Sequence, residues 1–218
     1  GVNGNELSMY DIYIEKSTKK HFRDNWLCVL KPFDIKPKSN GYDLYITDAL
    51  KKQTDNFIKQ YPSKLLVGIN LEGAVKGKKI RFSELYKICQ GLYKNNNKIQ
   101  ILILTTPNKF QRVSQKVIDM GFDYVAISFK TETIMALASL INQLDLIITP
   151  DTSISHIASA FNKPVVTIHE KNQESYCLFA PTSSLNKTVF STEVDSLAGY
   201  DIQKLIKFSN QLINKISL

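Results

Sequence analysis

The stretch Asp145-Leu-Ile-Ile-Thr-Pro-Asp-Thr-Ser-Ile-Ser-His-Ile-Ala-Ser-Ala-Phe-Asn-Lys-Pro-Val-Val-Thr-Ile168 decides the fold of this chain. Its first apolar run stops at Pro150, and hydroxyl and carboxylate side chains follow at once in residues 151–153. A helical apolar period begins at Ile154, and a second apolar run closes the stretch. The pattern predicts a strand, a tight polar turn, a helix and a second strand.

The same alternation extends from about residue 65 to residue 190. Apolar runs at 65–70, 99–104, 124–127 and 146–149 predict strands, and helical spacing predicts helices at 85–92, 111–120 and 134–141. The strand runs are almost continuously apolar, which is typical of parallel strands that helices cover on both faces. We therefore expect an α/β fold, a Rossmann-like parallel sheet with helices on both faces.

The two ends of the chain carry different patterns. An aromatic-rich start, a helix over about 19–30 and a Pro/Lys/Asn loop precede a boundary near Tyr61-Pro62-Ser63. From Ile202 to Ile216 the apolar residues keep helical spacing, which predicts a long terminal helix with one apolar face. The chain begins with Gly1 and a polar segment, so we expect it to be a piece of a longer protein.

The composition of the chain limits the kinds of molecule that we expect it to bind. The formal charge of +8 is spread over scattered lysines in 218 residues, which favours anionic small molecules and surfaces over a nucleic-acid stripe. The three cysteines are far apart and form neither a disulfide framework nor a metal cluster, and no cofactor motif is present. Without an apolar run of roughly 18–20 residues or a signal-peptide pattern, we expect a cytoplasmic protein.

The turn at Asp151–Ser155 lies where a parallel strand ends and a helix begins. Ligands of open parallel sheets bind at this edge, and the start of the following helix favours an anion. At about 100° per residue, His156 falls opposite the apolar residues Ile157, Ala158 and Phe161 and therefore faces solvent or a ligand. A diphosphate fits this description, although Asp151 or Ser153 as an ordinary N-cap beside an exposed histidine explains the pattern as well.

The run Asp151-Thr-Ser-Ile-Ser-His-Ile-Ala-Ser-Ala160, followed by Lys163-Pro-Val-Val166, resembles the signature of the lipopolysaccharide heptosyltransferases, glycosyltransferase family 9. Val67–Lys79 is similar to the family's first strand and its lysine-bearing loop, and Phe179-Ala-Pro181 resembles the region after its last motif strand. The resemblance spans about residues 65–190, the donor-binding C-terminal domain of that family.

The resemblance implies one half of a two-domain GT-B glycosyltransferase. Residues 1–64 would then be the end of the N-terminal domain and the interdomain connection, 65–195 the Rossmann-like donor-binding domain, and 196–218 the C-terminal helix. Such an enzyme transfers a sugar from a nucleotide-diphosphate donor, here expected to be ADP-heptose, to the bacterial lipopolysaccharide or lipooligosaccharide core. The partners implied are that donor, a lipid-linked oligosaccharide acceptor and the anionic inner membrane surface, without nucleic acid, metal or cofactor.

Carried over by position, the resemblance implies that Asp151 and His156 contact the donor sugar and that Thr152 and Ser153 hold the diphosphate. The catalytic base would lie in the absent N-terminal domain, so this piece alone would be inactive. A phosphate-binding lysine is expected in the loop after the first strand, as Lys78 or, nearly as well, Lys76. The alternative for that loop is a solvated lysine-rich segment.

The sequence departs from the family at the site itself. Ser153-Ile154 replaces a glycine and a small residue or proline, which restricts the approach of backbone to a phosphate. Lys109 stands where the family has a glutamate that contacts the ribose. His169 ends the next strand and could face the same cleft, whereas we expect Glu170 to be solvated.

These departures leave two further hypotheses. One is a non-catalytic sugar-nucleotide-binding or assembly module with the same fold. The other is a two-domain sugar-nucleotide epimerase, which has a similar architecture but does not predict the Asp-Thr-x-x-x-His-x-Ala-x-Ala run.

Overall fold

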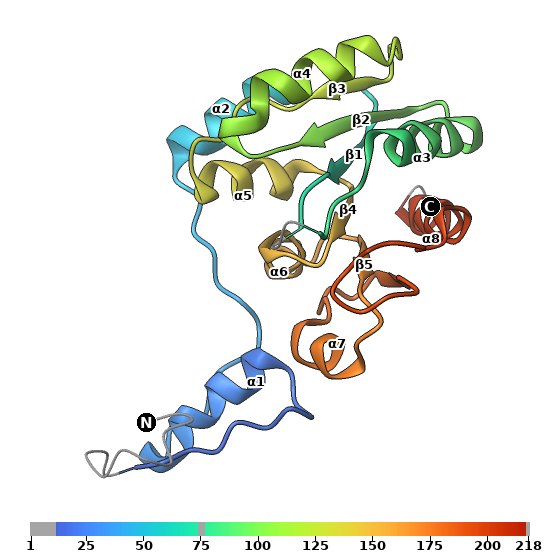
Figure 1. Cartoon of the computed structure of the whole chain (residues 1–218). Helices are drawn as coiled ribbons and strands as arrows, with labels where there is room; N and C mark the ends of the chain where they lie inside the picture. Colours follow the sequence, from blue (N-terminus) through green and yellow to red (C-terminus); the bar gives the residue numbers. More distant parts are fainter. Residues whose placement is uncertain (1–11, 74–76, 217–218) are drawn as a thin grey trace. The chain divides into compact units, whose positions relative to one another are not determined.

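The computed structural model describes residues 12–73 and 77–216 (Figure 1). The chain divides into two compact units. The smaller unit contains the described part of Gly1–Tyr42 together with Asn172–Ala180, and the sheet unit contains Asp43–Lys171 and Pro181–Leu218. In the described residues no helix is both long and apolar enough to cross a bilayer.

The sheet unit is built on six strands whose neighbours all pair in parallel, in the order β3-β2-β1-β4-β5-β6. The central strands are completely or almost completely buried, as the continuous apolar runs predicted. The predicted Rossmann-like sheet is therefore confirmed. The strands are β1 (Leu65–Asn70), β2 (Ile99–Leu104), β3 (Val125–Ile127), β4 (Leu146–Pro150), β5 (Val165–His169) and β6 (Asn186–Phe190).

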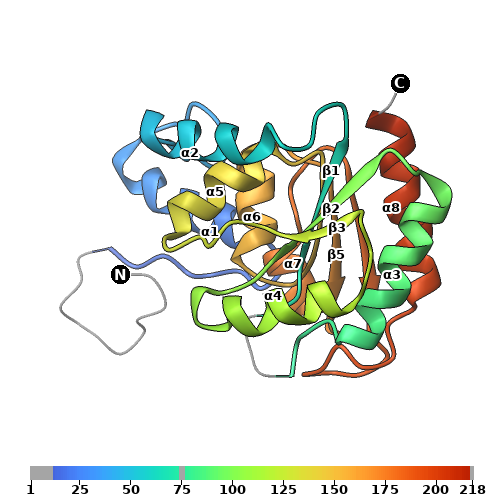
Figure 2. The ribbon, with the colours of Figure 1, turned by 90° about the horizontal axis from the view of Figure 1, so that it is seen from above.

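Helices cover both faces of this sheet (Figure 2). One face carries α3 (Phe82–Asn95), α4 (Phe110–Asp119), which follows the short η2 (Pro107–Lys109), and α8 (Ile202–Ile216). The other carries α2 (Asp48–Ile58), α5 (Ile134–Gln143) and α6 (Ser153–Ala160). Each layer has its own hydrophobic core, so the sheet is buried between two apolar layers.

The helix ends follow ordinary capping chemistry. The hydroxyls of Thr47, Thr133 and Thr152 accept backbone N–H bonds at the starts of α2, α5 and α6. Gly121, directly after the end of α4, has a φ of +68°, a conformation that glycine adopts without steric cost. The helix predicted over 111–120 therefore lies within one residue of the observed bounds of α4.

The strand order reverses between β1 and β4, and this point positions the site. A parallel sheet of this order leaves a crevice beyond the carboxyl ends of the two strands on either side of the reversal. At that edge the Asn70 side-chain amide donates to Thr149 Oγ1 at 3.0 Å, joining the end of β1 to the end of β4. The turn at Asp151 follows directly after the last residue of β4.

The smaller unit contains α1 (Phe22–Leu27), η1 (Cys28–Phe33) and α7 (Gln173–Phe179). The helix predicted over 19–30 is thus shorter and continues as a 3-10 helix, which has Pro32 inside it. His21 has a structural role, because its Nδ1 accepts from the Arg23 N–H at 3.1 Å and its Nε2 lies 3.0 Å from the Ala180 carbonyl oxygen. The assignment of residues 1–64 to a preceding domain stays a prediction.

Candidate functional site

The turn between β4 and α6 is fixed by its own hydrogen bonds. The Asp151 N–H donates to the Ile168 carbonyl at 3.0 Å, and Thr152 Oγ1 accepts from the Ile154 N–H at 3.1 Å. The Ser155 hydroxyl donates back to the Thr152 carbonyl at 2.8 Å. The turn therefore presents the positive end of α6 at the reversal point of the sheet.

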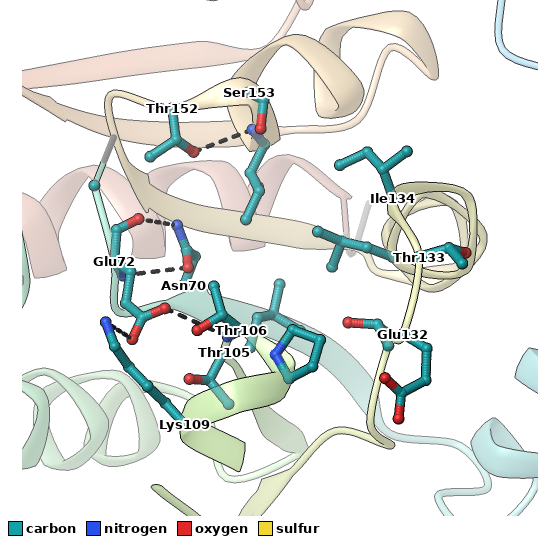
Figure 3. A pocket seen from close by; sticks show the side chains of 16 residues that line it. Asn70, Glu72, Thr105, Thr106, Lys109, Glu132, Thr133, Ile134, Thr152 and Ser153 are labelled. Atoms are coloured by element: carbon teal, nitrogen blue, oxygen red, sulfur yellow. Dashed lines mark hydrogen bonds and ion pairs between the residues drawn. The ribbon is translucent and has the colours of Figure 1, made fainter. Parts of the chain in front are cut away.

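A cavity of about 520 Å³ opens beside this turn (Figure 3). We call it the donor pocket because it is lined by Thr152 and Ser153, which the resemblance assigns to the donor diphosphate. It lies among the carboxyl ends of β1, β2 and β4 and the loop that leads into α5. Its volume lies within the range of small-molecule sites. The lining residues are Asn70, Glu72, Gly73, Leu104, Thr105, Thr106, Pro107, Lys109, Thr131, Glu132, Thr133, Ile134, Leu137, Thr152, Ser153 and Ile154.

One wall of the donor pocket is polar and held in place by Glu72. Its carboxylate accepts from Lys109 Nζ at 2.8 Å and from the Thr106 N–H at 3.3 Å, while the Asn70 amide donates to the Glu72 carbonyl at 2.7 Å. Burial by itself would raise the pKa of the Glu72 carboxyl, but the bonds from Lys109 and Thr106 outweigh it and the pKa is lowered. The wall therefore carries an ionised, preorganised carboxylate with a cation beside it.

The wall of the pocket also has an apolar part. It consists of Leu104, Pro107, Ile134, Leu137 and Ile154. A ligand with a flat apolar part, hydroxyl groups and an anionic end would find a matching surface for each part. The anionic end would lie toward the start of α6.

Asp151 of this turn belongs to a largely buried group of ionisable side chains, which we call the Lys78 cluster: Lys78, Asp151, His169 and Glu170. Lys78 Nζ pairs with Glu170 Oε1 at 3.0 Å, and Glu170 Oε2 accepts from the Asp195 N–H at 2.7 Å. His169 Nδ1 lies 3.7 Å from Asp151 Oδ2, and the His169 side chain is 1% exposed. Residues from the loop after β1 and from the ends of β4 and β5 thus meet in one polar cluster.

Burial is the main cause of the pKa shifts of Asp151 and His169 in this cluster. It raises the pKa of the Asp151 carboxyl, with Lys78 opposing the shift and Glu170 adding to it. It lowers the pKa of His169 to about 4, and electrostatic interactions with Lys78 and His156 act in the same direction. His169 is therefore a neutral imidazole at physiological pH.

The structure separates the predicted site residues into two groups. Thr152 and Ser153 line the donor pocket, whereas Asp151 and Lys78 belong to the Lys78 cluster. His156 is partly exposed on α6 and close enough to His169 to affect its pKa. Lys76 lies outside the described residues. The donor contacts of these side chains stay predictions.

One expectation about this region was wrong. Glu170 is not solvated as expected, because its side chain is 7% exposed and ion-paired with Lys78. Neither Ser153 nor Ile154 has a positive φ, so the backbone at this turn does not require glycine. Obstruction of a phosphate by the Ser153 side chain remains a prediction.

Sequence reasoning missed Asn70 and Glu72 as site residues. The signal was present, because both follow the apolar run of β1 and the carboxyl ends of parallel strands share one edge. Which strand adjoins β4 could not be read from the sequence. Within the described ranges, no group of three or more His, Cys, Asp or Glu side chains is arranged to hold a metal ion.

Comparison with known proteins agrees with this architecture. The sequence profile of glycosyltransferase family 9 (heptosyltransferase) matches residues 11–205. A family 9 glycosyl transferase from Veillonella parvula aligns over 93% of this chain and 63% of its own, with a TM-score of 0.78 and 17% identity. No curated protein sequence matches the chain at a significant level.

Two solved Escherichia coli structures are also similar. Heptosyltransferase WaaC with ADP aligns over 93% of this chain and 60% of its own, with a TM-score of 0.67 and 14% identity. ADP-heptose lps heptosyltransferase II aligns over 84% of this chain and 57% of its own, with a TM-score of 0.65 and 15% identity. The chain thus spans about three fifths of the length of these structures, and their likeness shows the fold. Because the family profile matches most of the length of this chain, the chain belongs to glycosyltransferase family 9.

Proposed function

We propose that this chain is the donor-binding part of a heptosyltransferase-like glycosyltransferase. The reaction is transfer of a sugar from a nucleotide diphosphate, with ADP-heptose as the proposed donor, to the lipopolysaccharide or lipooligosaccharide core. The observation that carries the proposal is the donor pocket, which joins the positive end of α6 to a carboxylate wall and an apolar wall at the sheet reversal.

Each part of a nucleoside diphosphate has a counterpart in the pocket. The diphosphate would lie at Thr152 and Ser153, where the helix dipole stabilises negative charge. The ribose hydroxyls would donate to polar groups of the Glu72 wall, and the base would lie against Ile134 and Leu137. Asp151 and His156 are proposed to contact the donor sugar.

The choice of ADP-heptose rests on the relatives. One similar structure is described as WaaC with ADP, and another as WaaC with ADP-2-deoxy-2-fluoro heptose. During transfer the protein would stabilise the charge that develops on the leaving diphosphate. We propose that a separate N-terminal domain, as the resemblance to the family implies, supplies the base that deprotonates the acceptor hydroxyl.

Calorimetric titration with ADP, UDP and GDP tests the donor assignment. We expect ADP to bind with the highest affinity, and Lys109→Met to weaken binding because it leaves the Glu72 carboxylate without its cation. Lys87→Met, on the exposed surface of α3, is the matched control. Failure of the folded chain to bind any of the three nucleotides would reject the proposal.

A non-catalytic nucleotide-binding module is the second candidate. The observation that favours it is the ion pair between Lys78 and Glu170, which neutralises the lysine predicted to hold phosphate. Release of ADP from ADP-heptose in the presence of a heptose acceptor distinguishes the two. If the chain is part of an enzyme, it should release ADP once it is combined with an N-terminal domain of the family. If it is a binding module, it should bind ADP-heptose and release no ADP.

We further propose peripheral contact with the anionic inner membrane surface, where a lipid-linked acceptor resides. The net charge of +8 supports this proposal, because basic segments are attracted to anionic lipid. Sedimentation with vesicles that contain phosphatidylglycerol should capture the protein at low salt. Equal recovery with purely zwitterionic vesicles would contradict the electrostatic contact.

A further inference from the structure

Two polar side chains are buried next to each other at the point where the strand order reverses. Asn70 is the last residue of β1 and is 4% exposed, and Thr149, in β4, is 0% exposed. Such groups stabilise a core no better than apolar side chains of the same shape, because their hydrogen bonds mainly offset the cost of removing them from water. A polar pair at this position is therefore expected to have a task beyond packing.

The Asn70 side chain holds the residue that carries the polar wall of the donor pocket. Its Nδ2 atom donates to the Glu72 carbonyl at 2.7 Å, and its Oδ1 atom accepts from the Glu72 N–H at 3.2 Å (Figure 3). Nδ2 also donates to Thr149 Oγ1 at 3.0 Å, so both hydrogens of the amide have an acceptor. Neither a carboxylate nor an alkyl group could donate to both neighbours, so these contacts require the amide.

The Thr149 hydroxyl extends this connection to the start of α6. It donates to the Pro150 carbonyl at 2.8 Å, and its oxygen lies 3.5 Å from Thr152 Oγ1. Thr152 Oγ1 in turn accepts from the Ile154 N–H in the first turn of α6. The contacts therefore run from the polar wall through the two buried side chains to the helix start.

We propose that Asn70 and Thr149 are positioning residues of the donor pocket, which fix the polar wall at Glu72 relative to the start of α6. A nucleoside diphosphate that touches both places gains the affinity of both contacts only when their separation matches its own length. Thr149 does not line the pocket and acts through its neighbours, so its role needs no contact with the ligand. The effect on ADP binding rests on the proposed function, whereas the connection between the polar wall and the helix start does not.

Thr149→Val and Thr149→Ser test this role, because valine has the shape of threonine without the hydroxyl and serine keeps the hydroxyl. Calorimetry measures the affinity for ADP, and NMR titration measures the affinities for the two half-ligands, adenosine and inorganic pyrophosphate. In Thr149→Val, ADP should bind about five- to tenfold more weakly, which corresponds to the loss of one hydrogen bond. Each half-ligand touches one place only, so its affinity should change less than about twofold. Thr149→Ser should keep the ADP affinity, because the acceptor for the Asn70 amide is retained.

Thr54→Val is the matched control. Thr54, in α2, is also 0% exposed, donates to the Leu50 carbonyl at 3.0 Å and shares a hydrogen bond of 2.8 Å with the Ser139 hydroxyl. It does not line the donor pocket. Urea unfolding should show similar losses of stability in Thr54→Val and Thr149→Val, while the control keeps its ADP affinity. Equal weakening of ADP binding by both variants would assign the effect to general destabilisation and overturn the inference.

Asn70→Ala removes the same connection from the other side. Because the two side chains act as one unit, Asn70→Ala/Thr149→Val should bind ADP about as weakly as Asn70→Ala alone. Thr149→Ala takes the place of the valine variant if that variant does not fold. Single losses that multiply in the double variant would show that the two side chains act separately, and equal ADP affinity in Thr149→Ser and Thr149→Val would show that the hydroxyl is unimportant. Either result would overturn the inference.

A measurement without ligand separates this inference from the donor assignment. Lys109→Met changes the polar wall at Glu72, and the amide resonance of Ile154 reports on the start of α6. The substitution should shift this resonance in the otherwise unchanged protein and leave it in place in the Thr149→Val background. Transmission of the shift without any ADP binding would reject the donor assignment and keep the positioning role. A resonance that stays in place in both backgrounds, or moves equally in both, would overturn the positioning role whether or not ADP binds.

Discussion

The Nζ atom of Lys78 lies 3.0 Å from Oε1 of Glu170, with only 11% and 7% of the two side chains exposed. The second carboxylate oxygen of Glu170 accepts from the Asp195 N–H at 2.7 Å. The lysine predicted to hold a donor phosphate therefore already has a carboxylate partner. A diphosphate that reaches this lysine has to compete with Glu170.

Breaking this pair by removing one partner should destabilise the fold. Lys78→Met and Glu170→Gln should each lower the free energy of unfolding by about 3 kcal/mol, because each leaves a buried charge uncompensated. The double variant should lose less than the sum of the two. Urea unfolding of the four proteins measures the coupling, and the exposed pair Lys130–Glu132 gives the control, with a loss below about 0.5 kcal/mol for Lys130→Met. Strict additivity at Lys78 and Glu170 would exclude coupling.

The same pair makes a prediction for nucleotide binding. In Glu170→Gln the ammonium of Lys78 is no longer neutralised, so we expect ADP to bind several-fold more tightly, whereas Lys78→Met should weaken it. Glutamine retains an oxygen that can accept from the Asp195 N–H, which limits local rearrangement. Calorimetry at low and moderate salt is the measurement. Unchanged ADP affinity in both variants would mean that Lys78 is not a phosphate ligand.

Protonation of His169 should make the fold sensitive to acid. Its pKa of about 4 in the folded chain lies below the ordinary value of 6.5, because burial and then Lys78 and His156 disfavour the charged imidazole. The unfolded chain therefore takes up a proton first as the pH falls. Stability should be undiminished above about pH 6.5 and should fall by about 1.4 kcal/mol per pH unit down to about pH 4.

His169→Phe removes this titration, so its stability should change less over the same pH range. Asp151 contributes with the opposite sign, because its raised pKa favours the folded state when the carboxyl is protonated. Denaturant unfolding at several pH values checks the slope, with His169→Gln as a second variant. Equal acid sensitivity with and without His169 would assign the loss to other groups.

The cap at Thr152 should serve both the fold and the ligand. Thr152→Ala removes the acceptor of the Ile154 N–H bond and should cost about 1 kcal/mol, while Thr152→Ser keeps the hydroxyl and should cost much less. Because the cap fixes the start of α6, ADP affinity should fall in the alanine variant and be largely kept in the serine variant. Thermal unfolding and calorimetry provide the two readouts. Identical behaviour of both variants would show that the cap hydroxyl is unimportant.

The sequence predicted the elements whose burial leaves a periodic signal. The bounds predicted for β1 and β2 agree with the structure to the residue, because both are continuous apolar runs between polar breaks. Helix α2 was missed because most of its residues are polar, and its one buried residue is Thr54, which shares a hydrogen bond with Ser139 of α5. Strand β6 was missed because it is half-buried and polar.

The sequence pointed only to those candidate site residues that lie close together in one short segment. Asp151, Thr152, Ser153 and His156 belong to a single turn and helix, so their spacing and its resemblance to the family signature together predicted a donor site there. The pairs Lys78–Glu170 and Glu72–Lys109 join segments far apart in the sequence, and only the order of the strands brings them together. The sequence carries no local signal for such contacts.

An amide-resolved NMR titration of the 218-residue chain with ADP tests the central claim most directly. The account predicts saturable binding, with the largest shifts at residues 152–154, 104–106 and 131–134, which line the donor pocket. Ile118 and Lys94, exposed on the outer surfaces of α4 and α3, should not shift. Absence of binding by the folded chain, or shifts confined to residues outside the donor pocket, would contradict it.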